Sequence, residues 1–119
     1  MADGPTIEIS DDDLLLRRLA SDHVSGDRVN SAAFSKKVPY EISVNLGRLT
    51  TEKKTLADRP SFGLGIISAG DVRDLGLVVR HDPEPGNFAH CLIVGKYTYA
   101  LAKELAKRTR LAKPPESKP

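Results

Sequence analysis

The chain has 119 residues, which suffices for one domain with one hydrophobic core and is too short for two. Its formal net charge is only +2, so overall charge gives no argument for binding nucleic acid. The single cysteine, Cys91, excludes a disulfide within the chain and fits a reducing compartment. Because no basic segment followed by a long apolar run opens the sequence, we expect a cytoplasmic protein without a signal peptide or membrane span.

Two assignments stay open for the segment that follows Ser10. Ser10 can cap a helix, and the aspartates Asp11–Asp13 would suit the positive end of its dipole, so these signals favour a helix. The alternative is a strand over Leu14–Leu19, because three consecutive leucines fit either period. Further along, polar and apolar residues alternate from Glu41 to Asn45, which predicts a half-buried strand.

The strongest local signals lie between Leu64 and Gly95. Ser68 followed three residues later by Asp71 predicts a helix start, and Gly76 can end that helix in the left-handed conformation. A shorter helix is expected at 52–57, capped by Thr50 or Thr51. The apolar runs of the central unit predict strands around 66–67, 77–79 and 91–94.

The segment from Tyr97 to Leu111 predicts a helix that packs on the sheet. Leu101 and Leu105 are spaced i,i+4 and form an apolar stripe. Basic side chains on this segment could contact nucleic-acid phosphates, but no aromatic residue is interleaved for base stacking, so a solvated face is favoured. These basic residues are Lys103, Lys107, Arg108 and Arg110.

Together these elements predict a single small α+β domain. We expect a mixed or antiparallel sheet of about four strands with packed helices, and the C-terminal helix on the sheet. The globular domain is expected to span residues 10–112. Residues 1–9 are expected to be disordered or extended, and the proline-rich residues 113–119 to form a disordered tail.

A pair of histidines at the predicted hairpin is the main candidate for chemistry. The segment Glu84–Asn87 places Pro85 and Gly86 at the centre of a type II turn. A two-residue loop centred there pairs His81 with His90, which brings their Cβ atoms to roughly 4.5–5.5 Å on one face of the sheet. The two imidazoles would then be neighbours at the rim of the core.

Neighbouring imidazoles can act as general base and general acid, because a positive charge on one ring disfavours protonation of the other. This is the logic of metal-independent ribonucleases. Alternatively, Asp82 could join both rings as a third metal ligand, or Asn87 and the turn amides could hold an anion. The commonest role of such residues is to close a sheet edge as hydrogen-bonded polar groups, and we predict no resident metal and no cofactor.

The polar motif of the hairpin also carries a resemblance to a known family. His81-Asp82-Pro83, Asn87 and Ala89-His90 form an HDP-x-P-x-N-x-AH segment that resembles a widespread family of short bacterial proteins without an established activity. The resemblance covers about residues 14–111. It implies a bacterial cytoplasmic origin, a defence-associated gene context and an extended conformation for the segment matching 15–19, but it supplies no catalytic residues.

We therefore predict a small bacterial binding or accessory module with its ligand or partner surface at the His81/His90 hairpin. The competing hypothesis is a metal-independent nuclease or related phosphoryl-transfer enzyme, with His81 and His90 as the catalytic pair. Arg17, Ser31, Asp82 and Asn87 are the candidate ligand-binding residues. The expected ligand is a protein partner or a phosphate-containing molecule, and no membrane partner is expected.

Overall fold

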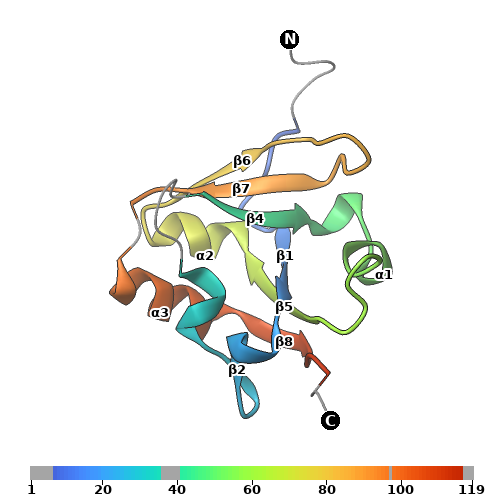
Figure 1. The fold of residues 1–119 in the computed structure, drawn as a ribbon. Coiled ribbons are helices and arrows are strands. Elements are labelled where there is room, and N and C mark those ends of the chain that lie inside the picture. Colours follow the sequence, from blue (N-terminus) through green and yellow to red (C-terminus); the bar gives the residue numbers. More distant parts are fainter. Residues whose placement is uncertain (1–6, 36–40, 97, 117–119) are drawn as a thin grey trace.

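The computed structural model describes residues 7–35, 41–96 and 98–116. In these residues the chain forms an α+β domain with a six-stranded antiparallel sheet in the order β6-β7-β4-β1-β5-β8 and a separate two-stranded ribbon of β2 and β3 (Figure 1). The strands are β1 (Leu14–Leu19), β2 (Val24–Ser25), β3 (Arg28–Val29), β4 (Glu41–Leu46), β5 (Gly63–Ser68), β6 (Val78–His81), β7 (His90–Val94) and β8 (Arg110–Lys113). The helices are α1 (Glu52–Thr55), α2 (Ala69–Asp74) and α3 (Tyr99–Arg108), with 3-10 turns η1 (Ser21–His23), η2 (Ser31–Phe34) and η3 (Gly47–Leu49).

The predicted α+β class and the antiparallel alternative are confirmed. The estimate of about four strands was too low, because β1 and β8 also belong to the main sheet. In both segments the local sequence favoured a structure other than a strand. Acidic residues precede β1, and β8 directly follows a strongly helical pattern.

The segment Leu14–Leu19 is a strand, so the favoured helix assignment was wrong and its strand alternative is confirmed. Leu15 and Leu19 enter the main core, whereas Leu16 packs in a second cluster on the opposite face. A central strand that is covered on both sides needs apolar residues at consecutive positions, and this accounts for the leucine run. The cap signals serve a tight turn instead, in which Ser10 N donates to a carboxylate oxygen of Asp13 at 2.8 Å.

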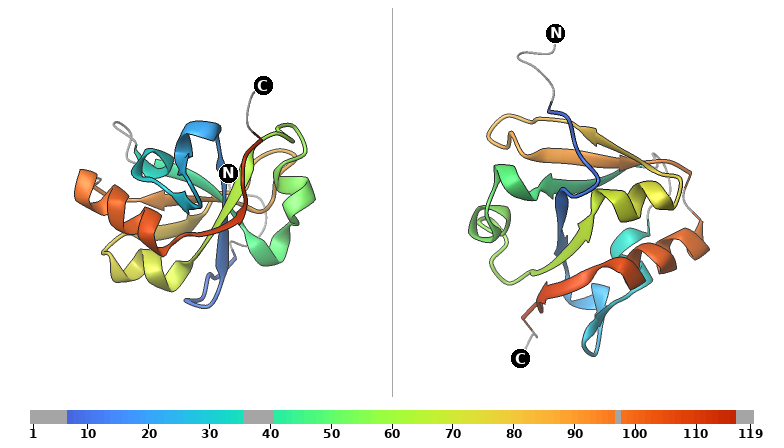
Figure 2. Two further views of the ribbon diagram at one scale, coloured as in Figure 1. Left: turned by 90° about the horizontal axis from the view of Figure 1, so that it is seen from below. Right: turned by 180° about the vertical axis from the view of Figure 1, so that it is seen from behind.

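The helices divide unequally between the two faces of the sheet. Figure 1 shows α2 and α3 together on one side of β1 and β5 and α1 on the other, and the view from behind in Figure 2 agrees. The main core includes Leu105 from α3 and Val72 from α2. The opposite face carries the small cluster of Leu16, Leu56 and Leu64. We call this second side, which is only partly covered, the open face.

The central unit between Leu64 and Gly95 has the predicted order of strand, helix and hairpin. The Ser68 side chain caps α2 by accepting from Asp71 N at 3.0 Å. Gly76 follows the helix with φ 83°, the left-handed conformation expected from its position. These predictions succeed because they depend on neighbouring residues alone.

The C-terminal helix is shorter than the predicted segment from Tyr97 to Leu111. It spans Tyr99–Arg108 and is capped by Thr98, and residue 97 lies outside the described part of the chain. The chain then becomes extended and adds β8 to the edge of β5. Lys113 belongs to β8, so the disordered tail predicted from that residue starts too early; residues 117–119 lie outside the described residues.

Ordered structure also extends before the predicted domain boundary at residue 10. Ile9 is a buried member of the main core, and Ile7 N donates to His81. The remainder of the segment predicted to be disordered or extended, residues 1–6, is outside the described ranges. None of the helices in the described part of the chain combines the length and the apolar character needed to cross a membrane.

An ion pair between Asp13 and Arg48 fastens the entry to β1. Arg48 Nε donates to Asp13 Oδ1 at 2.8 Å, and the Asp13 side chain is only 8% exposed. The hydrogen bond from Arg48 holds the pKa of Asp13 below its ordinary value of 3.8. Because the folded-state pKa lies below the unfolded-state value, the carboxylate stabilises the fold above about pH 3.8, and this contribution is lost as the pH falls through the folded-state pKa.

Replacing Asp13 with Asn is expected to lower the free energy of unfolding by about 2 kcal/mol at neutral pH, because it removes a charged hydrogen bond from a buried site. Urea unfolding at several pH values measures the effect. The difference from the unmodified protein should shrink below the folded-state pKa. Asp12→Asn is the matched control, because Asp12 is exposed. Equal losses in the two variants would contradict the role given to Asp13.

Candidate functional site

The hairpin between β6 and β7 has the predicted turn but a different strand register. Glu84 and Asn87 exchange backbone hydrogen bonds of 3.1 and 2.9 Å, and Gly86 has φ 78°. The predicted pairing of His81 with His90 is nevertheless wrong. In the ladder His81 pairs with Cys91, one residue further along.

An extra residue between the turn and β7 causes this shift. Two residues separate His81 from Glu84, whereas three separate Asn87 from Cys91. Pro83 has no N–H to give to the ladder, and the returning chain makes a second turn in which His90 N donates to Asn87 O at 3.3 Å. A bulge of this kind changes the face toward which the following side chains point.

The two imidazoles therefore project from opposite faces of the sheet. His81 shares a row with Cys91 and Val44, both of which are buried in the main core. His90 is paired with Asn45, and Asn45 with Leu16, which lies on the open face. Directly paired residues share a face, so the acid/base pair predicted from His81 and His90 does not form.

His81 is a structural residue in this arrangement. The residue is 7% exposed, and both ring nitrogens have partners. Ile7 N donates to Nδ1 at 3.1 Å, so the ring proton resides on Nε2, which donates to Phe88 O at 2.7 Å. The Phe88 ring packs edge-on against the imidazole at 4.9 Å between centroids. His81 thus joins the N-terminal segment, β6 and the hairpin loop.

His90 lies among acidic groups at the edge of the open face. Its Nδ1 is 2.8 Å from the main-chain oxygen of Asp82, which can only accept, so Nδ1 carries a proton. Asp82 Oδ2 lies 3.2 Å from Nδ1, and Glu84 Oε2 lies 3.8 Å from it. Because His81 is on the other face, the predicted metal set of Asp82 with both imidazoles is also wrong.

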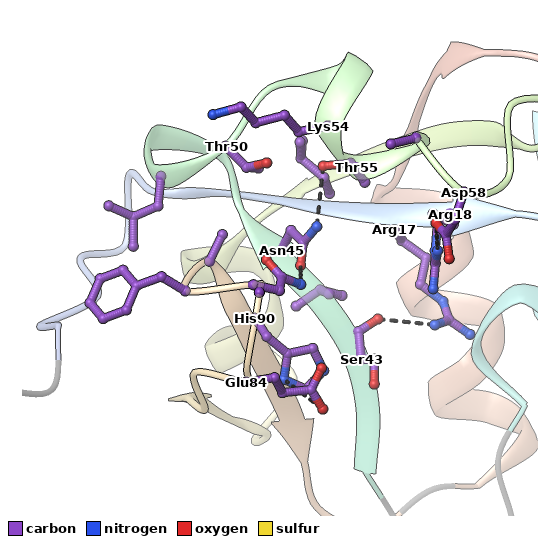
Figure 3. A pocket seen from close by; sticks show the side chains of 18 residues that line it. Arg17, Arg18, Ser43, Asn45, Thr50, Lys54, Thr55, Asp58, Glu84 and His90 are labelled. Atoms are coloured by element: carbon purple, nitrogen blue, oxygen red, sulfur yellow. Dashed lines mark hydrogen bonds and ion pairs between the residues drawn. The ribbon is translucent and has the colours of Figure 1, made fainter. Parts of the chain in front are cut away.

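A polar pocket of about 710 Å³ opens on the same face as His90 (Figure 3). We call it the open-face pocket. Its walls come from β1, β4, the region around α1 and the hairpin loop. The lining residues are Leu16, Arg17, Arg18, Ser43, Val44, Asn45, Leu49, Thr50, Lys54, Thr55, Ala57, Asp58, Glu84, Gly86, Asn87, Phe88, Ala89 and His90.

A hydrogen-bonded chain of polar side chains connects three walls of the pocket. Asn45 Nδ2 donates to Thr55 Oγ1 at 3.2 Å, and Asn87 Nδ2 donates to Asn45 Oδ1 at 2.9 Å. These hydrogen bonds tie the region of α1 and the hairpin loop to β4, and Figure 3 shows them as dashed lines. It fixes the orientation of the two amides that face the pocket.

The predicted ligand-binding residues are only partly brought together. Asn87 and Arg17 line the pocket, whereas Ser31 in η2 and Asp82 do not. The Arg17 side chain also has a structural task, because it donates to Ala33 O and to Ser43 O at 3.0 Å each. Asp82 faces His90 at the edge of the site.

Several residues of the pocket were missed in the sequence. The polar positions of the alternating strand, Ser43 and Asn45, could have been found, because the apolar positions of β4 fill the core and leave the polar ones on the other face. Arg18 lies on β1 on the same face as Leu16. Lys54 and Asp58 gave no such signal. Their place at the pocket depends on how the region of α1 folds over the sheet.

Cys91 is a small residue of the apolar strand β7. It is fully buried, and its thiol donates to Ala89 O at 3.5 Å. Burial raises the pKa of the Cys91 thiol to about 11. A thiol in this state does not supply the thiolate that nucleophilic catalysis requires.

Two of the basic residues at the C-terminal end have acidic partners within the fold. Arg108 donates to Asp74 at 2.8 Å, and Lys107 lies 3.5 Å from Glu104. Lys103 lies 5.4 Å from the centre of the Tyr99 ring. These contacts favour a solvated face, and nucleic-acid binding through Lys103, Lys107, Arg108 and Arg110 stays a prediction.

Comparisons of the chain with protein-family models, with curated proteins and with solved structures found no match. The resemblance carried by the HDP-x-P-x-N-x-AH segment therefore stays a prediction. The same holds for the bacterial origin and the defence-associated context that it implies. Function has to be argued from the site itself.

The hydrogen-bond partners predict opposite tautomers for the two hairpin histidines. At about pH 8, where an ordinary histidine is neutral, long-range ¹H–¹⁵N spectra should show the proton on Nε2 of His81 and on Nδ1 of His90. Assignment by single His→Gln variants identifies each ring. Two rings in the same tautomer would contradict the described contacts.

Proposed function

We propose that the protein is a small binding module whose ligand carries a phosphate group and occupies the open-face pocket. The observation that carries the proposal is the convergence of basic, amide and hydroxyl side chains on one pocket of about 710 Å³. This volume lies within the range of small-molecule sites. The pocket lies at the hairpin, which the sequence singled out as the ligand surface.

The charge of the pocket supports an anionic ligand. Three basic residues line it against two acidic ones, an excess of one positive charge before His90 is counted. Arg18 is paired with Asp58 at 3.0 Å. Lys54 makes no ion pair with any residue that the structure describes, so its ammonium group is available to a ligand.

The neutral groups of the pocket add hydrogen-bonding capacity. Phosphate oxygens accept from amides and hydroxyls. The pocket is lined by Asn87 from the hairpin loop and by Thr50 and Lys54 from the region of α1. Because Asn45 already holds the Asn87 amide in place, little side-chain freedom would be lost on binding. Such preorganisation is typical of binding sites.

Binding is better supported than turnover. General acid/base catalysis of phosphoryl transfer by a histidine pair needs two imidazoles at one site, and here the second ring lies on the other face. His90 Nδ1 is engaged by the main-chain oxygen of Asp82. Phe88 lines the pocket and is 51% exposed although it is a large apolar residue, so a protein partner is the second candidate.

Lys54→Gln tests the proposed ligand class. Inorganic phosphate and nucleoside monophosphates serve as probes, and an NMR titration follows the side-chain amide signals of Asn45 and Asn87. The unmodified protein should bind at least one probe with shifts confined to the pocket. The variant should bind about tenfold more weakly, because it loses one charge-assisted hydrogen bond.

Lys53→Gln is the matched control, because Lys53 is the exposed neighbour of Lys54 on α1 and does not line the pocket. Its affinity for the same probe should equal that of the unmodified protein. Equal weakening in the two variants would indicate general electrostatic attraction rather than a site. Absence of shifts with every phosphate probe would contradict the proposed ligand class.

A further inference from the structure

At the rim of the open-face pocket, one cluster has the composition of a metal site. Asp82, Glu84 and His90 each offer a ligand atom, and these atoms all lie within 4.8 Å of one another. We propose that this cluster binds a divalent first-row transition-metal ion through two carboxylates and Nδ1 of the imidazole. The proposal revises the prediction that the protein has no metal, and it does not rest on the proposed phosphate ligand.

The distances within the cluster suit such an ion. Nδ1 of His90 lies 3.2 Å from Asp82 Oδ2 and 3.8 Å from Glu84 Oε2. Ligands held at about 2.1 Å from one ion are roughly 3.0–3.5 Å apart, so only small side-chain movements are needed. The main-chain oxygen of Asp82, 2.8 Å from Nδ1, is a further oxygen donor beside the same position.

The local sequence explains why the two carboxylates lie together. Each acidic residue is followed by a proline, Pro83 and Pro85, and a residue before proline is confined to extended conformations. Side chains two positions apart on an extended chain point to the same side. A backbone hydrogen bond of 2.9 Å from Asp82 N to His90 O holds the main chain of His90 beside that of Asp82.

The imidazole of His90 must lose its proton from Nδ1 before this nitrogen can bind a metal ion. Nδ1 now donates to Asp82 O, so its lone pair is not available. When the ion binds, the proton leaves Nδ1 and a neutral ring carries its proton on Nε2 instead. Metal binding thus reverses the tautomer of His90, whereas His81 keeps its own, because both of its nitrogens are engaged elsewhere.

The ligand set favours a transition metal over calcium or magnesium. Imidazole nitrogen is a common ligand for zinc, copper, iron and nickel ions, whereas calcium and magnesium prefer oxygen ligands. Glu84 and His90 also line the open-face pocket, so the ion would lie at its rim. Three protein side chains leave coordination positions open to water or a ligand.

The test uses the full chain after removal of metals, with zinc chloride as the probe. Titration calorimetry should give one ion per chain. Long-range ¹H–¹⁵N spectra should show that the proton of His90 moves from Nδ1 to Nε2, with His23 and His81 unchanged. Glu84→Gln should weaken the affinity by at least about tenfold, since loss of even an outer-shell partner has an effect of that size.

Asp58→Asn is the matched control, because Asp58 is a carboxylate of the same pocket outside the cluster. It should bind zinc as the unmodified protein does. Glu84 is suited to the test because its side chain is 53% exposed, so its replacement should leave the fold intact. No binding at one ion per chain, a response of His23 in place of His90, or equal affinity in the Glu84 variant would each overturn the proposal.

The proposal of a metal site and the proposal of a phosphate ligand can be contradicted independently of each other. Zinc binding is measured without phosphate, and Lys54→Gln should leave it unchanged, because Lys54 is not part of the cluster. Zinc binding that persists while no phosphate probe binds would contradict the proposed ligand class alone. Phosphate binding with no response of His90 to zinc would contradict the metal site alone.

Discussion

The extra residue between the hairpin turn and β7 determines which way His90 points, and the candidate site depends on it. With a simple two-residue hairpin, His81 and His90 would share a face. The additional residue lets Cys91 pair with His81 and turns His90 to the open face. The ladder thereby gives the core a small apolar residue beside a hydrogen-bonded histidine, and it gives the opposite face an imidazole close to carboxylates.

Consequently, one face of the sheet forms the main core and the other carries the pocket. Apolar residues from β1, β4, β7 and the two longer helices fill one side and supply most of the buried apolar area. The other side has only a small apolar cluster around Leu16, and beyond it polar residues of β1 and β4 remain uncovered. The region of α1 and the hairpin loop form walls around these residues. A pocket results because the open face is bounded by elements that do not cover it.

Local chemistry made part of the fold predictable. The cap at Ser68, the glycine at Gly76 and the turn around Gly86 depend on conformational preferences of a few neighbouring residues, and the structure confirms each. The nature of the Leu14–Leu19 segment and the existence of β8 depend on burial against distant strands. Their local signals pointed to a helix and a tail, because a sequence window contains no information about which edge or face is available.

The residues of the candidate site also fall into those that local sequence predicts and those that it does not. Asn87 was predicted from the turn motif, and Asn45 belongs to an alternation that already indicated which side chains leave the core. Lys54 and Asp58 join the site only through the path of the chain around α1. The register of the hairpin lay beyond local prediction, since the missing N–H of Pro83 permits a bulge without fixing its position.

The placement of the two imidazoles on opposite faces is the central claim, and contacts between ring protons test it most directly. A nuclear Overhauser spectrum of the assigned protein should connect the His81 ring to the Phe88 ring and the His90 ring to the side chain of Asn45. No cross-peak should join the two histidine rings. A strong cross-peak between His81 and His90 would show that they share a face and would contradict the account of the hairpin, the pocket and the metal cluster.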